Sequence, residues 1–147
     1  MTAPDLPAIT LATLCYHAMF YGCSSLTSAP ALPATTLADN CYSNMFNGCS
    51  SLTNAPVLPA TTLANRCYFH MFIHCHNLSY VKCLATDISA EECLSDWLFN
   101  VANTGTFVKS PAMSDWPTGP SGIPIGWTVM NAGVGGGNED VGYDDLL

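Results

Sequence analysis

Residues 69–77, FHMFIHCHN, gather the side chains of this chain that are best suited to bind a metal ion. His70, His74 and His76 surround Cys75, and imidazole and thiolate groups are ligands that zinc prefers. His70 and His74 are four residues apart, a spacing that lets two imidazoles share one ion on a helix. The first hypothesis is therefore a metal-dependent enzyme, and the alternative is a histidine-rich surface without a metal.

The elements that would have to position these histidines come from an internal repeat of 26 residues. Residues 26–51 align with residues 52–77 with identity at sixteen of 26 positions. Residues 3–25 are an incomplete copy before them, and a degenerate copy follows from residue 78. A fixed period of this length is typical of solenoids, in which each unit buries its apolar face against its neighbours.

Each repeat is expected to form a short strand followed by a short helix. The apolar residues of 26–32 suit a strand, and Pro30 and Pro33 keep it short because proline donates no backbone hydrogen bond. Apolar residues then recur at helical spacing, which predicts a helix over 37–47. Gly48 follows where a helix commonly ends with a positive φ. The predicted fold class is an α/β repeat.

The register of the repeat argues against a metal site at the histidines. Gly48 takes the place of His74 one repeat earlier, and Gly22 takes it two repeats earlier, so the predicted helix ends at position 74. His70 and His74 then no longer share one helical face, and Cys75 points into the core. We therefore expect no native metal ion or other cofactor. Two surface histidines can still bind nickel or zinc adventitiously.

The eight cysteines follow the same period. Two ladders at intervals of 26 contain all but Cys83: Cys15, Cys41, Cys67 and Cys93 in one, and Cys23, Cys49 and Cys75 in the other. A disulfide within one repeat would span eight residues of the predicted helix, about 12 Å, which exceeds the limit of roughly 7 Å between the Cα atoms. No Cys-x-x-Cys pair suits zinc. We expect buried free thiols that pack as small apolar groups.

One motif is specific enough to indicate a family. Residues 46–52, FNGCSSL, within NCYSNMFNGCSSLTNAPVLP, resemble the BspA-type leucine-rich repeats of bacterial surface proteins in a 26-residue form. The closing segment, GTFVKS to WPTGPSGIPIGWTV, resembles the ending of such proteins from gut anaerobes. The resemblance covers residues 3 to about 100 and this ending. It implies a short leucine-rich-repeat solenoid that adheres to, or recognises, a protein or a glycan.

Different patterns appear after the third repeat. Ser89 precedes Glu92 by three residues, a capping box that predicts a helix over 90–102. The runs TFVK at 106–109 and GWTVM at 126–130 are typical of strands. The tryptophans of this part occupy core registers, which favours a packing role over an aromatic platform for sugars.

These patterns divide the chain into three parts. Residues 1–104 are assigned to the solenoid of three to four repeats, and 105–131 to a C-terminal β cap, because a solenoid needs a cap on its last open face. Residues 132–147 are a glycine-rich and acidic tail, expected to be a disordered linker or to lie on a neighbouring chain. The first repeat has no such cap, so we expect a preceding domain or another subunit to cover it.

Composition and charge exclude several classes of partner. The chain has three basic and eleven acidic residues and a formal net charge of −8, which argues against nucleic acid and anionic lipid as partners. It contains no run of 18 apolar residues, so we expect no membrane insertion. The start, MTAPDLPAIT, lacks the features of a secretory signal. An exported protein would have lost its signal or would leave the cell without one.

No arrangement of residues indicates catalysis. The sequence offers no Ser-His-Asp set with supporting spacing, no glycine-rich phosphate loop and no paired carboxylates, so we predict a protein that is not an enzyme. Solenoids instead present extended binding surfaces, and residues that differ from their counterparts in sister repeats mark two of them. The strand face carries Asn54, Tyr80 and Lys82, and the helix side of the third repeat carries Arg66, Phe69, His70 and Ile73. Phe69 and Ile73 are expected to be exposed together as a contact patch.

The leading prediction is a non-catalytic recognition or adhesion module outside the cell or on its surface. The alternative is a structural or receptor-binding component of a bacteriophage tail or fibre, located in the virion. This alternative accounts for the small size, the missing signal and the uncapped start. It also implies a homo-oligomer or a larger assembly formed through the open N-terminal end and the tail. A metal-dependent enzyme using the histidines ranks third.

Overall fold

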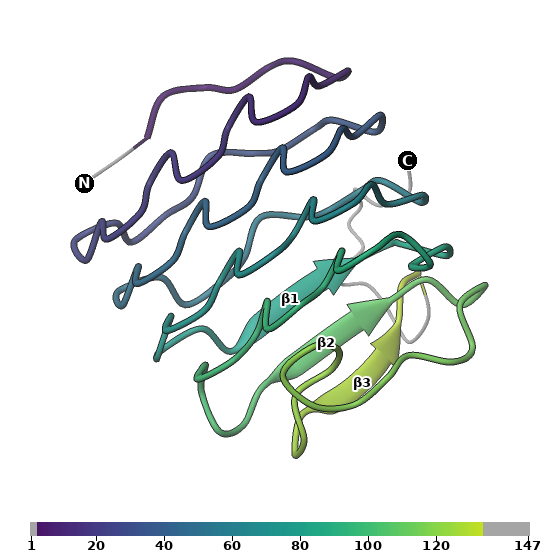
Figure 1. Cartoon of the computed structure of the whole chain (residues 1–147). Coiled ribbons are helices and arrows are strands. Elements are labelled where there is room, and N and C mark those ends of the chain that lie inside the picture. Colours follow the sequence, from purple (N-terminus) through teal and green to yellow (C-terminus); the bar gives the residue numbers. More distant parts are fainter. Residues whose placement is uncertain (1–2, 134–147) are drawn as a thin grey trace.

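The computed structural model describes residues 3–133, which wind into a repeat solenoid of stacked coils (Figure 1). We define four coils by the 26-residue period: 3–25, 26–51, 52–77 and 78–103. Three short strands lie side by side at the end of the stack away from the first coil. They are β1 (Tyr80–Cys83), β2 (Thr106–Lys109) and β3 (Thr128–Asn131). Together they form one parallel sheet in the order β1-β2-β3.

The helices predicted over 37–47 and 90–102 are wrong, because residues 3–133 contain no helix. In the second coil the backbone instead makes consecutive β-turns. Asn40, Asn44 and Gly48 have positive φ angles of 57°, 56° and 78°. The third position of a type II turn requires this conformation. The positive φ predicted at Gly48 is therefore confirmed, but it ends a turn and not a helix.

Backbone hydrogen bonds explain why turns replace the helix. The N–H of Met45 donates to the Tyr42 carbonyl at 3.1 Å, closing a turn, while the N–H of Phe46 donates to Met71 in the next coil at 2.9 Å. This alternation continues along each coil and leaves no N–H for the i to i−4 bonds of an α-helix. A pair of turns spans four residues, close to the 3.6 of a helix, so both structures place apolar residues at similar spacing.

The strand expected in each repeat forms fully only in the fourth coil. The second and third coils contribute isolated parallel bridges, such as Asn54 to Tyr80 and Leu58 to Cys83. Pro30 and Pro56 occupy the position of Lys82, and proline cannot donate to a ladder. The strand predicted at 106–109 is confirmed, and the one predicted at 126–130 lies slightly later, at Thr128–Asn131.

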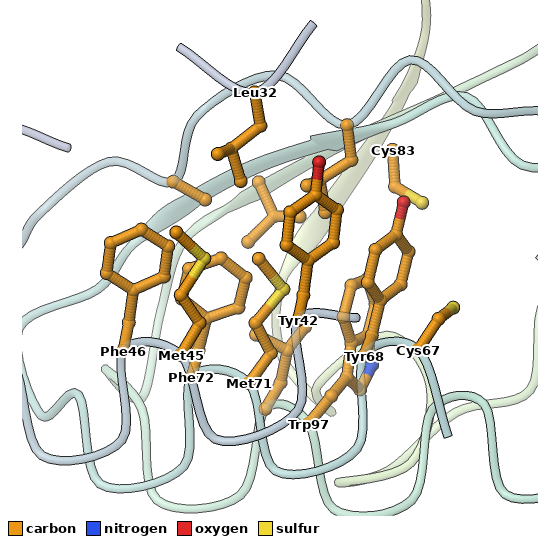
Figure 2. Close-up of a cluster of buried hydrophobic side chains, with 14 of the residues drawn as sticks. Leu32, Tyr42, Met45, Phe46, Cys67, Tyr68, Met71, Phe72, Cys83 and Trp97 are labelled. Carbon is orange, nitrogen blue, oxygen red and sulfur yellow. The ribbon is translucent and has the colours of Figure 1, made fainter. Parts of the chain in front are cut away.

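The core consists of ladders that run from coil to coil. Figure 2 shows the phenylalanine rings and the tyrosine rings as parallel layers, with methionines between the two rows. The ring of Phe46 stacks on Phe20 at 5.5 Å and on Phe72 at 5.4 Å. Tyr42 stacks on Tyr16 and Tyr68, both at 6.0 Å. Identical rings at a fixed register explain why the repeat tolerates so few changes at these positions.

The cysteine ladders complete this core. All eight cysteines are free, and six of them are buried, which confirms the prediction of free thiols. Cys49 Sγ donates to the Phe20 carbonyl at 3.2 Å, and Cys75 Sγ donates to the Phe46 carbonyl at 3.0 Å. These thiols therefore fill space in the core, and their hydrogen bonds connect neighbouring coils.

The chain after the fourth coil folds back over that coil. Trp97 is fully buried, stacks on Trp116 at 6.1 Å and donates its indole N–H to the Gly122 carbonyl at 2.9 Å. Trp127 donates to the Ala102 carbonyl at 2.9 Å. Both tryptophans thus pack as core residues in the described part of the chain. The predicted tail from 132 lies outside the described residues, except for its first two positions.

Candidate binding surfaces

A groove runs along the strand side of the second and third coils. Its volume is about 780 Å³. Proline and alanine dominate its lining, including Pro30, Pro33, Pro56 and Pro59. The prolines that interrupt strand pairing also have small side chains. The same residues therefore keep the strand short and leave room for the groove. Val57 lies in this groove and is 47% exposed.

The structure brings together the three residues predicted on the strand face. Asn54 pairs with Tyr80 in a parallel bridge, and Lys82 lies two residues along β1 from Tyr80. Val81 and Cys83 point into the core and are fully buried, so Tyr80 and Lys82 share the opposite face of β1. Lys82 lines the groove but is only 5% exposed. A ligand in the groove would therefore meet Lys82 at its floor.

The turn side of the third coil differs from the predicted patch. Ile73 is only 9% exposed, so the expectation that Phe69 and Ile73 are exposed together is wrong. The register of the coils places Ile73 between positions 47 and 99 of the adjacent coils. Phe69 is half-buried, and its ring stacks on that of His70 at 3.9 Å.

Arg66, the remaining residue of that predicted surface, is exposed and already paired. Its guanidinium donates to Glu92 of the fourth coil. The carboxylate raises the pKa of Arg66 through this hydrogen bond and its charge. Because both groups are solvent-exposed, the ion pair contributes little to stability.

The histidines do not gather as the spacing suggested. His70 stacks on Phe69, whereas the rings of His74 and His76 lie 6.2 Å apart. The Asn100 amide nitrogen lies 3.1 Å from both His74 Nδ1 and His76 Nε2. The i, i+2 pair converges because His74 occupies a turn position with a φ of 64°. No group of three or more histidine, cysteine or acidic side chains within residues 3–133 is placed to hold a metal ion.

One further contact joins a histidine to a serine, as in a catalytic pair, but the serine is buried. His17 Nδ1 lies 2.7 Å from Ser43 Oγ. Ser43 is only 1% exposed, so its hydroxyl cannot reach a substrate at the surface. A serine nucleophile must be accessible as well as paired with a base, so this contact serves packing between the first two coils.

The thiols are held in their protonated form. Burial raises the pKa of Cys41 and Cys49 to about 11 and that of Cys75 and Cys83 to about 12. Because the thiolate is the reactive form of cysteine, these four groups are unreactive near neutral pH in the folded chain.

Comparison of the chain with family models, curated proteins and solved structures finds no match. The described residues also contain no helix that is long and apolar enough to cross a membrane.

Proposed function

We propose that this chain is a non-catalytic recognition module that binds a protein segment in its strand-side groove. The observation that carries the proposal is the groove of about 780 Å³ over the second and third coils. Recognition pockets are commonly concave, mostly apolar and preformed, with few polar groups. The groove has this character, with Lys82 as the only charged residue among the described residues that line it.

A protein ligand suits this groove better than a glycan. Sugar sites need polar side chains, and an aromatic ring commonly supports the sugar, whereas the lining is mainly proline, alanine, leucine and valine. Such a surface favours the apolar side chains of an extended peptide. The resemblance to BspA-type leucine-rich repeats adds support for adhesion at the cell surface or outside the cell. Asn54 and Tyr80 each precede a lining residue, Pro56 and Lys82, by two positions, and we propose that they contribute polar contacts.

The groove can be tested by selection of ligands. The full chain is screened against a displayed peptide library and a glycan array, together with Val57→Arg and a control, Ile125→Arg. Both substituted residues are exposed, at 47% and 80%, so both variants should fold. We expect enriched peptides that lose binding to Val57→Arg and keep binding to Ile125→Arg. Ligands that bind both variants equally would rule out the groove.

The second candidate function is a structural component of a bacteriophage particle. The observation that favours it is the asymmetry of the stack, whose fourth coil is covered by residues 116–127 and whose first coil has no such cover among the described residues. An uncovered coil suits assembly with another protein. Mass spectrometry of purified phage particles would detect the chain if it is a virion component.

A further inference from the structure

In the turn segments, the backbone hydrogen bonds between adjacent coils all run in one direction. Every second N–H of the first coil's turn segment donates to a carbonyl of the second coil, over distances of 2.7 to 3.2 Å. The donors are Leu14, Tyr16, Ala18, Phe20 and Gly22. The second coil donates to the third in the same way, and the third to the fourth. The stack therefore has a carbonyl edge at its first coil and an N–H edge at its fourth.

The edge of the first coil presents carbonyl acceptors in its turn segment. The N–H groups between the inter-coil donors close turns within the coil, as Cys15 does with Ala12 and Met19 with Tyr16. Each carbonyl of the second coil that accepts one of these inter-coil bonds has a counterpart in the first coil, 26 residues earlier. No described residue donates to these counterparts. These carbonyls belong to Thr13, Cys15, His17, Met19 and Tyr21. The result is a row of five acceptors at fixed spacing.

Two N–H groups at the edge of the fourth coil are engaged within the chain. Asp96 N–H donates to Ser121 Oγ at 2.9 Å, and Leu98 N–H donates to the Pro120 carbonyl at 3.1 Å. The Trp97 ring between them stacks on Trp116. A second copy of this chain cannot offer these donors while its own residues 116–123 cover them.

The uncovered coil is also apolar. Four of the nine large hydrophobic residues that are substantially exposed lie in it, Ile9, Leu14, Met19 and Tyr21. The counterparts of two exposed residues are fully buried in the second coil: Met45 for Met19 and Cys41 for Cys15. Exposed apolar side chains gathered on one coil are a feature of interaction sites.

We infer that this open end docks the N–H edge of another repeat of the same 26-residue kind, whichever chain carries it, and not a second open end. Two carbonyl rows facing each other would repel and leave their acceptors unpaired, which costs free energy when they are buried. A repeat that supplies donors would continue the interface already present between coils, with its own rings on Tyr16 and Phe20. The inference concerns the end of the stack and does not depend on the groove.

The first test extends the full chain by one repeat. A copy of residues 26–52 fused directly before Met1 keeps the 26-residue register, with its own cysteines changed to alanine. The control carries the same residues in scrambled order. We expect the docked repeat to slow labelling of Cys15 by a disulfide reagent by about tenfold or more, because the thiol becomes as covered as Cys41. A labelling rate within about twofold of the control would overturn the inference.

The second test uses the unmodified chain, so it does not depend on the fusion being folded. Light scattering over a wide concentration range should show a monomer, because two acceptor edges do not pair. A dimer that Met19→Glu dissociates would overturn the inference, since it would place two open ends against each other. A dimer that Met19→Glu leaves intact would also overturn the monomer expected here.

Discussion

The buried thiols should make this protein unfold at moderately alkaline pH. The perturbation is a rise in pH from 8 to 10, with all cysteines kept reduced. In the folded chain burial holds the pKa of Cys41 and Cys49 at about 11 and that of Cys75 and Cys83 at about 12, against an ordinary value near 9. These thiols stay protonated at pH 10 in the folded state and ionise in the unfolded state.

The sign follows from the raised pKa values. Their contribution to stability is complete below about pH 9 and is lost as the pH rises toward 11 and 12. One pKa unit corresponds to about 1.4 kcal/mol, so each thiol lowers the free energy of unfolding by about 1.4 kcal/mol at pH 10. Four such groups together remove about 5 kcal/mol, which is comparable to the whole stability of a small domain.

Urea unfolding followed by circular dichroism at pH 7, 8, 9 and 10 measures this loss. Cys49→Ala should reduce the pH dependence by one thiol's share, and Cys15→Ala, at an exposed position, serves as the control. Comparing the two variants cancels the titration of lysines and tyrosines. A free energy of unfolding that stays constant from pH 8 to 10, or equal slopes in the two variants, would refute the reasoning.

Three further predictions concern packing, backbone and the histidines. Phe46→Ala should lower the free energy of unfolding by about 3 to 5 kcal/mol, and more than Phe20→Ala, because Phe46 stacks on both sides and Phe20 on one; equal losses in urea unfolding would contradict a continuous ladder. Gly48→Ala should cost about 1 to 2 kcal/mol, since its φ is 78° and the new Cβ meets only backbone atoms of Gly22, Cα at 3.7 Å and N at 3.9 Å; a stabilised variant would show that the turn can rearrange. Zinc titrated by calorimetry should bind no tighter than micromolar and should lose binding in His76→Gln, because His74 and His76 converge on one point; an unaffected His76→Gln would assign the ion to another site.

The sequence by itself determined the period and the inside of this protein. Identities at an offset of 26 identify the ladder positions, and Cys41, Tyr42, Met45 and Phe46 are all at most 2% exposed. The strand at 106–109 was also readable, because its first three residues are β-branched or aromatic and the run is flanked by turn residues. Which positions of a repeat face inward depends on residue composition and on the repeat period, and both can be read from a sequence.

The conformation of the turn side was decided only by tertiary structure. A helix and a row of turns place apolar residues at almost the same spacing over eleven residues, and the choice depends on hydrogen bonds to carbonyls in the next coil. A local clue was present in Asn40, Asn44 and Gly48, since asparagine and glycine tolerate positive φ best. Arg66 and His70 occupy the same positions in the third coil and hide that clue.

The candidate sites depended on the same distinction. His74 and His76 converge, and Ile73 is covered, because consecutive turns and the adjacent coils set the direction of each side chain. The groove likewise requires three coils in register before the prolines of two of them can form one surface. A single repeat contains every residue type involved, but the stacking of coils determines which side chains meet.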